Sequence, residues 1–189
     1  MRGPAGRVAA VVGATLRAEP KLAGTRLVCL DGPSASGKTT LAGAVGAALR
    51  RRGCRTTTVH MDDLYDGWTG LRPDLEPRVL AQVLDPLAQG RAARLQRYDW
   101  YAGTFADWVD LPPPDVLVLE GCGSGARAYA RYRSLLVWLE APVRTRLQRW
   151  VDRDGPGVVD RRERWMAAEA AHFAINLTRD NADISLQAG

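Results

Sequence analysis

The sequence predicts an α/β fold in which a mostly parallel five-stranded sheet is covered by helices on both faces. Three observations lead to this fold class. Short apolar runs alternate along the chain with segments of helical spacing, and a glycine-rich turn joins the first such run to a helix. The composition, 46% hydrophobic and 25% charged over 189 residues, is that of an ordinary globular protein, so residues 1–189 are expected to form a single domain.

The first segment, about residues 1–24, is expected to be a helical extension of that domain. Its apolar run at 8–16 is too short to cross a bilayer. Arg17 and Glu19 stand where a secretory signal would carry small residues for cleavage, and Pro20 then ends the helix. The sequence therefore predicts a cytoplasmic protein that makes no contact with a membrane.

The remaining elements follow from apolar and β-branched runs and from the glycines and prolines between them. Strands are expected at residues 26–32, 55–61, 115–121, 134–142 and 182–187. Helices are expected at residues 39–53, 76–90, 143–155 and 161–179. Gly53 suits a helix C-cap, Pro86 a kink and Pro142 the first turn of a helix. Residues 91–111 are expected to form either an irregular excursion or a hairpin.

The charge pattern and the cysteines exclude several classes of protein. The chain has 26 Lys and Arg residues against 21 Asp and Glu residues, which gives a net charge of +5. Only Lys21 and Lys38 are lysines, and the arginines are scattered along the chain. Because no RNA- or DNA-binding motif accompanies them, no nucleic-acid partner is predicted. Cys29, Cys54 and Cys122 lack paired spacing, so neither a zinc site nor a disulfide framework is expected.

The segment "GPSASGKTT" at residues 32–40 fits the phosphate-binding pattern G-x-x-x-x-G-K-[ST], and it lies between a predicted strand and a predicted helix as that motif requires. Backbone N–H groups and a helix N-terminus favour a bound phosphate there. Lys38 is expected to reach the β- and γ-phosphates, and the Thr39 hydroxyl is expected to ligate Mg²⁺. The motif predicts ATP and Mg²⁺ as cofactors, held by Gly32, Pro33, Ser34, Ala35, Ser36, Gly37, Lys38, Thr39 and Thr40.

The predicted strand at 115–121 ends in Glu120, a carboxylate expected on the phosphate-loop side of the sheet. This position suits a role near Mg²⁺ or within its water shell. The chain carries no N-K-x-D pattern for guanine recognition, and it is small for a motor ATPase. A phosphotransferase and a nucleotide-binding regulatory protein remain as the two classes to separate.

The stretch "HMDDLYDGW" at residues 60–68 follows the second predicted strand. A carboxylate at this place would lie beside the phosphate loop, where it could take the proton of an acceptor hydroxyl. Asp62 is the favoured general base, while Asp63 is kept as an alternative base or as a metal ligand. Tyr65 and Trp68 are expected to form walls of the acceptor pocket.

These segments occur in a familiar order. The sequence resembles the uridine kinase family and its pantothenate-kinase and phosphoribulokinase relatives in a series of short motifs. The matching segments are "GPSASGKTT", "DDLY", "RYDW" and "VLVLEG", followed by "RLQRWVDRDG" and "DNADISLQAG". The resemblance runs over about residues 26–189. It implies a P-loop NTPase fold of the nucleoside- and nucleotide-kinase type, with an arginine-bearing lid at about residues 149–165.

The resemblance also implies roles for particular residues. Asp62 would be the catalytic base and Tyr65 would line the acceptor pocket. The segment "RYDW" would place Tyr98, Asp99 and Trp100 at the acceptor site. Arg149 and Arg153 would sit on the lid, where their i,i+4 spacing directs both guanidinium groups to one helical face and toward the phosphate that is transferred.

The sequence departs from the family pattern at two places. Ala35 replaces the middle glycine of the usual G-x-S-G-x-G-K loop, and Leu71 falls where the family carries an Asp that holds ribose hydroxyls. Six of the eleven Trp and Tyr residues nevertheless lie between 65 and 108, which favours a flat or apolar acceptor pocket. His60 and His172 have no motif partner and are expected to be structural.

The sequence therefore predicts an ATP- and Mg²⁺-dependent kinase that transfers the γ-phosphate to a hydroxyl, most simply that of a uridine- or cytidine-type nucleoside. A kinase for another hydroxyl compound, such as an antibiotic, a sugar or a vitamin precursor, is the first alternative. A non-catalytic nucleotide-binding regulatory protein is the second. The expected partners are a nucleotide and a small-molecule acceptor. The preference for ATP over GTP and a homo-oligomeric state are left open.

Overall fold

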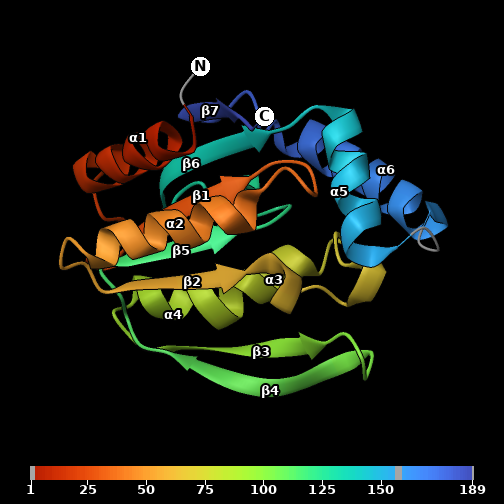
Figure 1. The fold of residues 1–189 in the computed structure, drawn as a ribbon. Coiled ribbons are helices and arrows are strands. Elements are labelled where there is room, and N and C mark those ends of the chain that lie inside the picture. The colour runs from red at the N-terminus through yellow and green to blue at the C-terminus, as the bar shows by residue number, and fades with distance from the viewer. Residues whose placement is uncertain (1–2, 156–158, 189) are drawn as a thin grey trace.

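The computed structural model describes residues 3–155 and 159–188, and it confirms the predicted fold class. Five strands form one parallel sheet in the order β2-β5-β1-β6-β7 (Figure 1). The strands are β1 (Arg26–Asp31), β2 (Thr56–His60), β5 (Val116–Glu120), β6 (Arg133–Glu140) and β7 (Ile184–Gln187). All five predicted strands are present, each within a few residues of its expected bounds.

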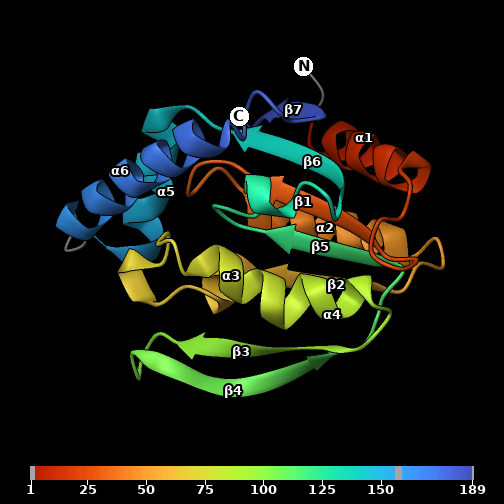
Figure 2. The same cartoon turned by 180° about the vertical axis from the view of Figure 1, so that it is seen from behind.

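The sheet is covered on both faces, as the unbroken apolar runs of its central strands require. Every residue of β5 and all but the first of β1 are buried. Figures 1 and 2 show α1 (Pro4–Arg17) and α2 (Lys38–Arg50) on one face of the sheet, and α3 (Leu75–Val79) and α4 (Asp85–Ala88) on the other. Each face has its own hydrophobic cluster, with Val11, Val45 and Val137 in one and Val79, Leu87 and Leu119 in the other.

The helix predicted at 76–90 is interrupted rather than kinked. A π-helical turn at Leu80–Leu84 separates α3 from α4. Pro86 explains the wide turn, because it has no backbone N–H and its ring would collide with the carbonyl four residues earlier in a regular helix. Pro142 also differs slightly from the expectation, since it is the N-cap residue just before α5 (Val143–Asp154).

Residues 91–111 form a hairpin, which decides between the two expectations for this segment. β3 (Ala93–Asp99) and β4 (Thr104–Leu111) pair antiparallel as a separate two-stranded sheet. Figure 1 shows the hairpin beyond the β2 edge of the main sheet. Most of β4 is exposed, so its sequence shows little of the alternation that identifies a half-buried strand.

Helices α5 and α6 (Val159–Asn176) lie together at the end of the molecule toward which the parallel strands point (Figures 1 and 2). The predicted lid at 149–165 comprises the end of α5 and the start of α6, and residues 156–158 of it lie outside the described part of the chain. The carboxyl ends of parallel strands are where ligands bind in open α/β sheets. Among the described helices, none has the length and apolar character that crossing a membrane requires.

Candidate active site

The phosphate loop connects β1 to the first residue of α2, and its glycines have backbone conformations that other residues avoid. Gly32 has a φ of 139°, and a Cβ atom there would lie 2.1 Å from the Leu139 carbonyl oxygen. Gly37, just before α2, has a φ of 99°. Ala35 has a φ of 61°, in the left-handed region that costs a non-glycine residue about 1 kcal/mol. The loop therefore holds a non-glycine residue in a backbone conformation that usually favours glycine.

Lys38 is buried beneath the loop. Its Nζ donates hydrogen bonds to the Gly32 carbonyl at 2.8 Å and to the Pro33 carbonyl at 2.9 Å. Burial alone would lower the pKa of Lys38, but neighbouring acidic groups, including Asp31 and Glu169, outweigh this effect and raise the pKa above its usual value. Lys38 is therefore a cation at neutral pH at the centre of the predicted phosphate site.

A cavity of about 210 Å³ opens beside the loop, and we call it the P-loop cavity. Its lining residues come from the loop and the start of α2, from the turn after β2, from the end of β5 and the residues after it, and from α5. They are Ser34, Ala35, Gly37, Lys38, Thr39, Thr40, Asp62, Glu120, Gly121, Cys122, Arg149 and Arg153. Of the nine predicted loop residues, six line this cavity, and a seventh, Ser36, lines a third cavity that is described below. The structure brings the loop, Asp62, Glu120 and both predicted lid arginines to one place.

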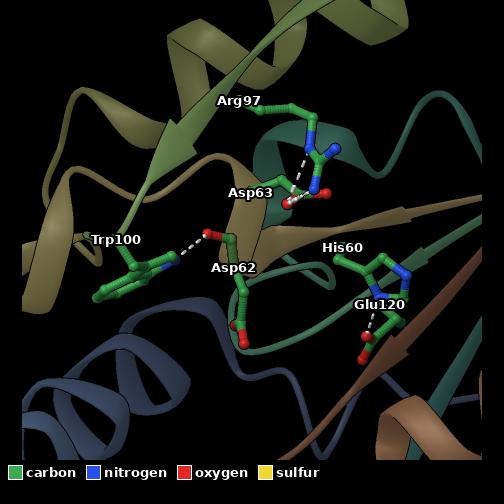
Figure 3. Close-up of polar contacts among 6 residues, drawn as sticks. All are labelled: His60, Asp62, Asp63, Arg97, Trp100 and Glu120. Carbon is green, nitrogen blue, oxygen red and sulfur yellow. Dashed lines mark hydrogen bonds and ion pairs between the residues drawn. The ribbon is translucent and has the colours of Figure 1, made fainter. Parts of the chain in front are cut away.

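Asp62 and Asp63 belong to the 3₁₀ turn η1 (Met61–Asp63) directly after β2, but their side chains point in different directions (Figure 3). Asp62 lines the P-loop cavity. Asp63 Oδ1 pairs with Arg97 of the hairpin at 3.2 Å and lines a separate hollow between β2 and the hairpin. The structure therefore separates Asp63 from the phosphate loop, and of the two side chains Asp62 is the one that lines the P-loop cavity.

The environment of Asp62 raises its pKa above the ordinary aspartate value. The side chain is accessible to solvent, but the walls of the cleft surround it, and this desolvation is the main cause. The negative charge of Glu120 adds to it, while Lys38 and Arg153 act in the opposite direction. A carboxylate with a raised pKa is a stronger base than an ordinary one, which suits proton transfer near neutral pH.

Glu120 ends β5 as predicted, and it is paired with a residue whose role the sequence did not indicate. His60 Nδ1 lies 2.5 Å from Glu120 Oε1, and Figure 3 shows the contact. The hydrogen bond to Glu120 is the main cause of the raised pKa of His60, which favours its protonated form. The structure explains the pair, because β2 and β5 are neighbours that end in register at His60 and Glu120, and the sequence alone does not show that these two strands are adjacent.

Thr39 and Glu120 are the predicted metal ligands that share the P-loop cavity. Mg²⁺ is usually held by one or two protein oxygens together with phosphate oxygens and water, so this sparse donor set fits a metal that arrives with a nucleotide. The described residues contain no cluster of three or more His, Cys, Asp or Glu side chains that would hold a metal by itself.

A second cavity of about 380 Å³ adjoins the first, and we call it the aromatic cavity. It is lined by Ser34, Asp62, Tyr65, Trp68, Trp100, Trp150, Arg153 and Trp165. Four predicted acceptor-side residues, Asp62, Tyr65, Trp68 and Trp100, are thus gathered here. Asp62, Arg153 and Ser34 line both cavities and stand at the boundary between them.

Tyr98 and Asp99 lie outside this lining. The Tyr98 ring packs behind Trp100, with 5.3 Å between ring centroids. Asp99 Oδ1 accepts hydrogen bonds from the Tyr101 and Ala102 backbone N–H groups and so closes the hairpin turn. Both residues support the hairpin that carries Trp100, and neither contributes a wall to the cavity.

Helix α6 contributes contacts to the phosphate loop that the sequence did not predict. Glu169 is buried, and its Oε1 accepts the Ser34 backbone N–H at 2.8 Å and the Trp165 Nε1–H at 2.6 Å. Trp165 Nε1 also lies 2.8 Å from the Ser34 hydroxyl oxygen. The i,i+4 spacing of Trp165 and Glu169 could have shown that they share a helix face, but not that this face meets the loop.

The lid arginines follow the predicted arrangement on one face of α5. Arg149 Nη1 donates to the Ala35 carbonyl at 3.1 Å, and Arg153 lies over the Trp150 ring with its Cζ 5.4 Å from the centroid. Both line the P-loop cavity. Two guanidinium groups and Lys38 thus surround a space in which phosphate oxygens would be stabilised.

Asp31, at the end of β1, fixes the loop after β5 against the phosphate loop. Its carboxylate accepts the backbone N–H groups of Gly32 at 2.7 Å, Gly123 at 3.1 Å and Gly125 at 2.8 Å. Complete burial raises the pKa of Asp31 from 3.8 to about 6, although these hydrogen bonds and Lys38 act against the rise. Nothing in the sequence indicates this role, because all three donors are backbone groups.

A third cavity of about 330 Å³ lies on the far side of the loop from the aromatic cavity. Gly37, Thr40 and Arg149 contribute to it, together with Arg7 of α1 and Ala188 near the C-terminus. Arg7 Nη1 donates to the Gln187 carbonyl at 3.0 Å, which ties α1 to the last strand. The N-terminal helix therefore forms one wall of a space continuous with the phosphate loop.

No family model and no curated protein matches the sequence. Solved structures do match the fold. A possible uridine kinase from Bacillus stearothermophilus has a TM-score of 0.71 at 21% identity, covering 95% of this chain and 97% of that one. A Silicibacter protein provisionally named a fructose transport system kinase has a TM-score of 0.68 at 23% identity, covering 95% and 98%.

A third match is a D-glycerate 3-kinase from Cryptococcus neoformans, with a TM-score of 0.54 at 14% identity over 93% of this chain and 87% of that one. The three proteins are named for three different acceptors, and their identity to this chain is low. The likeness is therefore one of architecture, and the chain has the fold of the P-loop kinases.

Proposed function

We propose that the protein is an ATP- and Mg²⁺-dependent small-molecule kinase. The observation that carries the proposal is the position of Asp62, which lines both the P-loop cavity and the aromatic cavity. A protein that only binds a nucleotide needs the first cavity, but it has no need of a base at the mouth of the second. The fold shared with P-loop kinases supports the same conclusion.

In this proposal the acceptor occupies the aromatic cavity and presents its hydroxyl to Asp62. The Asp62 carboxylate takes the hydroxyl proton, the hydroxyl oxygen forms a bond to the γ-phosphorus, and the bond between that phosphorus and the leaving ADP oxygen breaks. A general base of this kind contributes about 10²–10⁴ in rate. The rise in the pKa of Asp62 favours acceptance of the proton.

Three cationic side chains would stabilise the phosphate as it is transferred. Lys38 is held under the loop, and Arg149 and Arg153 border the same cavity from α5. In phosphoryl transfer most of the catalysis comes from such positioning and charge stabilisation. Thr39 and Glu120 would hold Mg²⁺, which, when bound, neutralises charge on the phosphate oxygens. The base of the nucleotide would extend into the cavity beside α1.

A pyrimidine nucleoside such as uridine or cytidine is the first acceptor to test, because its flat base would stack on the tryptophan walls. Asp63 is not included in the machinery, since Arg97 holds it away from the loop. The test measures ADP formation with ATP and Mg²⁺ across a panel of nucleosides, sugars, glycerate and aromatic alcohols.

Lys38→Ala should remove most of the acceptor-dependent turnover, whereas Lys21→Ala, at the exposed second lysine, should not. Circular dichroism establishes that both variants are folded. If no acceptor raises ADP formation above the background hydrolysis of ATP, the kinase proposal fails and the nucleotide-binding regulatory protein takes its place. Full activity in Lys38→Ala would refute the assignment of the phosphate loop.

A further inference from the structure

The aromatic cavity is bounded by one connected group of rings. The Trp68 ring centroid lies 5.6 Å from that of Trp100, 6.1 Å from that of Trp150 and 6.3 Å from that of Trp165. Tyr65 continues the group through Trp165, at 5.0 Å. Three of these pairs pack edge to face and the Trp68–Trp150 pair is tilted, so the rings hold one another in place and present a fixed, largely apolar wall to a ligand.

Three of the five rings in this wall use their polar atoms within the protein. Tyr65 Oη donates to a backbone carbonyl in the loop after β5 at 2.7 Å. Trp100 Nε1 donates to a backbone carbonyl of η1 at 3.0 Å, a contact visible in Figure 3. Trp165 Nε1 donates to Glu169 at 2.6 Å. Tyr65, Trp100 and Trp165 therefore offer a ligand their faces and edges rather than a hydrogen-bond donor.

The polar side chains in the lining are the Asp62 carboxylate, the Ser34 hydroxyl and the Arg153 guanidinium. Among the described residues that line the cavity, Asp62 is the one carboxylate, and the proposed reaction assigns it to the reacting hydroxyl. Leu71, at the place of the family's ribose-binding Asp, packs against the hydrophobic core. A ligand with further hydroxyl groups would bury donors with too few acceptors, at a cost of about 1–3 kcal/mol each.

The charge of the cavity also limits the ligand. The Arg153 guanidinium already lies over the Trp150 ring, at 5.4 Å, where a cationic ligand would otherwise be attracted. The opposite charge of Asp62 lies in the same lining, so neither a cation nor an anion has an unopposed partner. These features favour an uncharged ligand.

We propose that the acceptor is an uncharged alcohol that the cavity recognises through a flat ring system and not through a vicinal diol. This inference rests on the kinase function proposed above. The cavity volume of about 380 Å³ is within the usual range for a small-molecule site. Polyols such as fructose, and the anion glycerate, are poor acceptors in this account, and a ribose diol contributes nothing to recognition.

The direct test compares matched acceptors in the ADP-formation assay. Uridine and 2′,3′-dideoxyuridine share a base and a 5′-hydroxyl but differ in the diol, and we expect kcat/KM for the dideoxy compound to equal or exceed that for uridine. We expect 2-phenylethanol to exceed fructose and glycerate by at least about tenfold, the effect of one unpaired hydroxyl. A tenfold loss on removal of the diol, or a preference for fructose or glycerate, overturns the inference while leaving the kinase function intact.

A variant pair tests the wall itself. Trp68→Leu should raise KM for the ring alcohol at least about tenfold and leave KM for ATP unchanged, and Trp68→Phe should restore most of the loss. Trp108→Leu, on the exposed hairpin strand outside the cavity, is the matched control and should change neither value. An unchanged acceptor KM in Trp68→Leu contradicts the inference. Absence of transfer to every acceptor refutes the kinase function as well, so the two failures are distinguishable.

Discussion

The Glu169 carboxylate accepts the backbone N–H of Ser34 at 2.8 Å, which ties helix α6 directly to the phosphate loop. The same oxygen accepts the Trp165 indole N–H, and Trp165 in turn contacts the Ser34 hydroxyl. Ser34 lines both cavities. Helix α6 therefore helps to hold the loop residue that stands between the two cavities.

Glu169→Ala should weaken nucleotide binding, because it removes the acceptor of the Ser34 backbone N–H and leaves the Trp165 N–H with the Ser34 hydroxyl as its remaining acceptor. An unpaired buried donor costs about 1–3 kcal/mol, so we expect KM for ATP to rise roughly tenfold or more. Glu169→Gln keeps one acceptor oxygen and should recover part of the loss.

Glu163→Ala is the control for this prediction, since Glu163 is an exposed carboxylate on the same helix. It should leave KM for ATP unchanged. If Glu169→Ala also left KM for ATP unchanged and lowered only the thermal stability, Glu169 would have a purely structural role.

Arg153→Ala should lower kcat by about 10², a typical loss when one group that stabilises transition-state charge is removed. Arg153→Lys should recover only part of the rate, because an ammonium group cannot form the bidentate hydrogen bonds to phosphate oxygens that a guanidinium forms. Arg144→Ala, an exposed arginine on the same helix, is the control. Equal rates for Arg153→Ala and Arg144→Ala would exclude the assigned role.

Asp31 should make the stability of the protein depend on pH in an unusual direction for an aspartate. Because its folded-state pKa is raised from 3.8 to about 6, folding favours the protonated form. The contribution of Asp31 is therefore fully present below pH 3.8 and is lost as pH rises through about 6, by up to about 3 kcal/mol.

Urea unfolding at pH values from 4 to 8 measures this effect as the difference between the wild type and Asp31→Asn, which does not titrate. We expect the wild type to lose stability relative to the variant as pH rises. Parallel stability curves would contradict the prediction. Should the variant not fold, the carboxyl carbon of Asp31 in the wild type should titrate by NMR near pH 6.

The parts of this protein that the sequence predicted are those with strong local signals. β1 and β5 are unbroken apolar runs, and the loop between β1 and α2 carries a spaced glycine–lysine pattern, so neither depends on distant contacts. Glu120 could be placed because it ends β5, and Asp62 could be placed because it follows the β-branched run of β2.

The parts that the sequence did not predict depend on how distant elements pack. Trp165 and Glu169 reach the loop because α6 folds back over it, and nothing in their own helix indicates that partner. Asp63 was a candidate because it neighbours Asp62, but successive residues of a tight turn point in different directions, and the hairpin supplies Arg97 on the other side. Tyr98 and Asp99 likewise serve the hairpin turn rather than the cavity wall.

The most direct test of the central claim is steady-state kinetics of Asp62→Asn beside Asp63→Asn, with the best acceptor from the panel and with ATP affinity measured separately. Because Asp62 joins the two cavities and Asp63 faces Arg97, we predict that Asp62→Asn lowers kcat by about 10²–10⁴ with ATP affinity unchanged, while Asp63→Asn retains nearly full activity. The reverse result, in which Asp63→Asn lowers kcat strongly and Asp62→Asn keeps nearly full activity, would contradict this assignment.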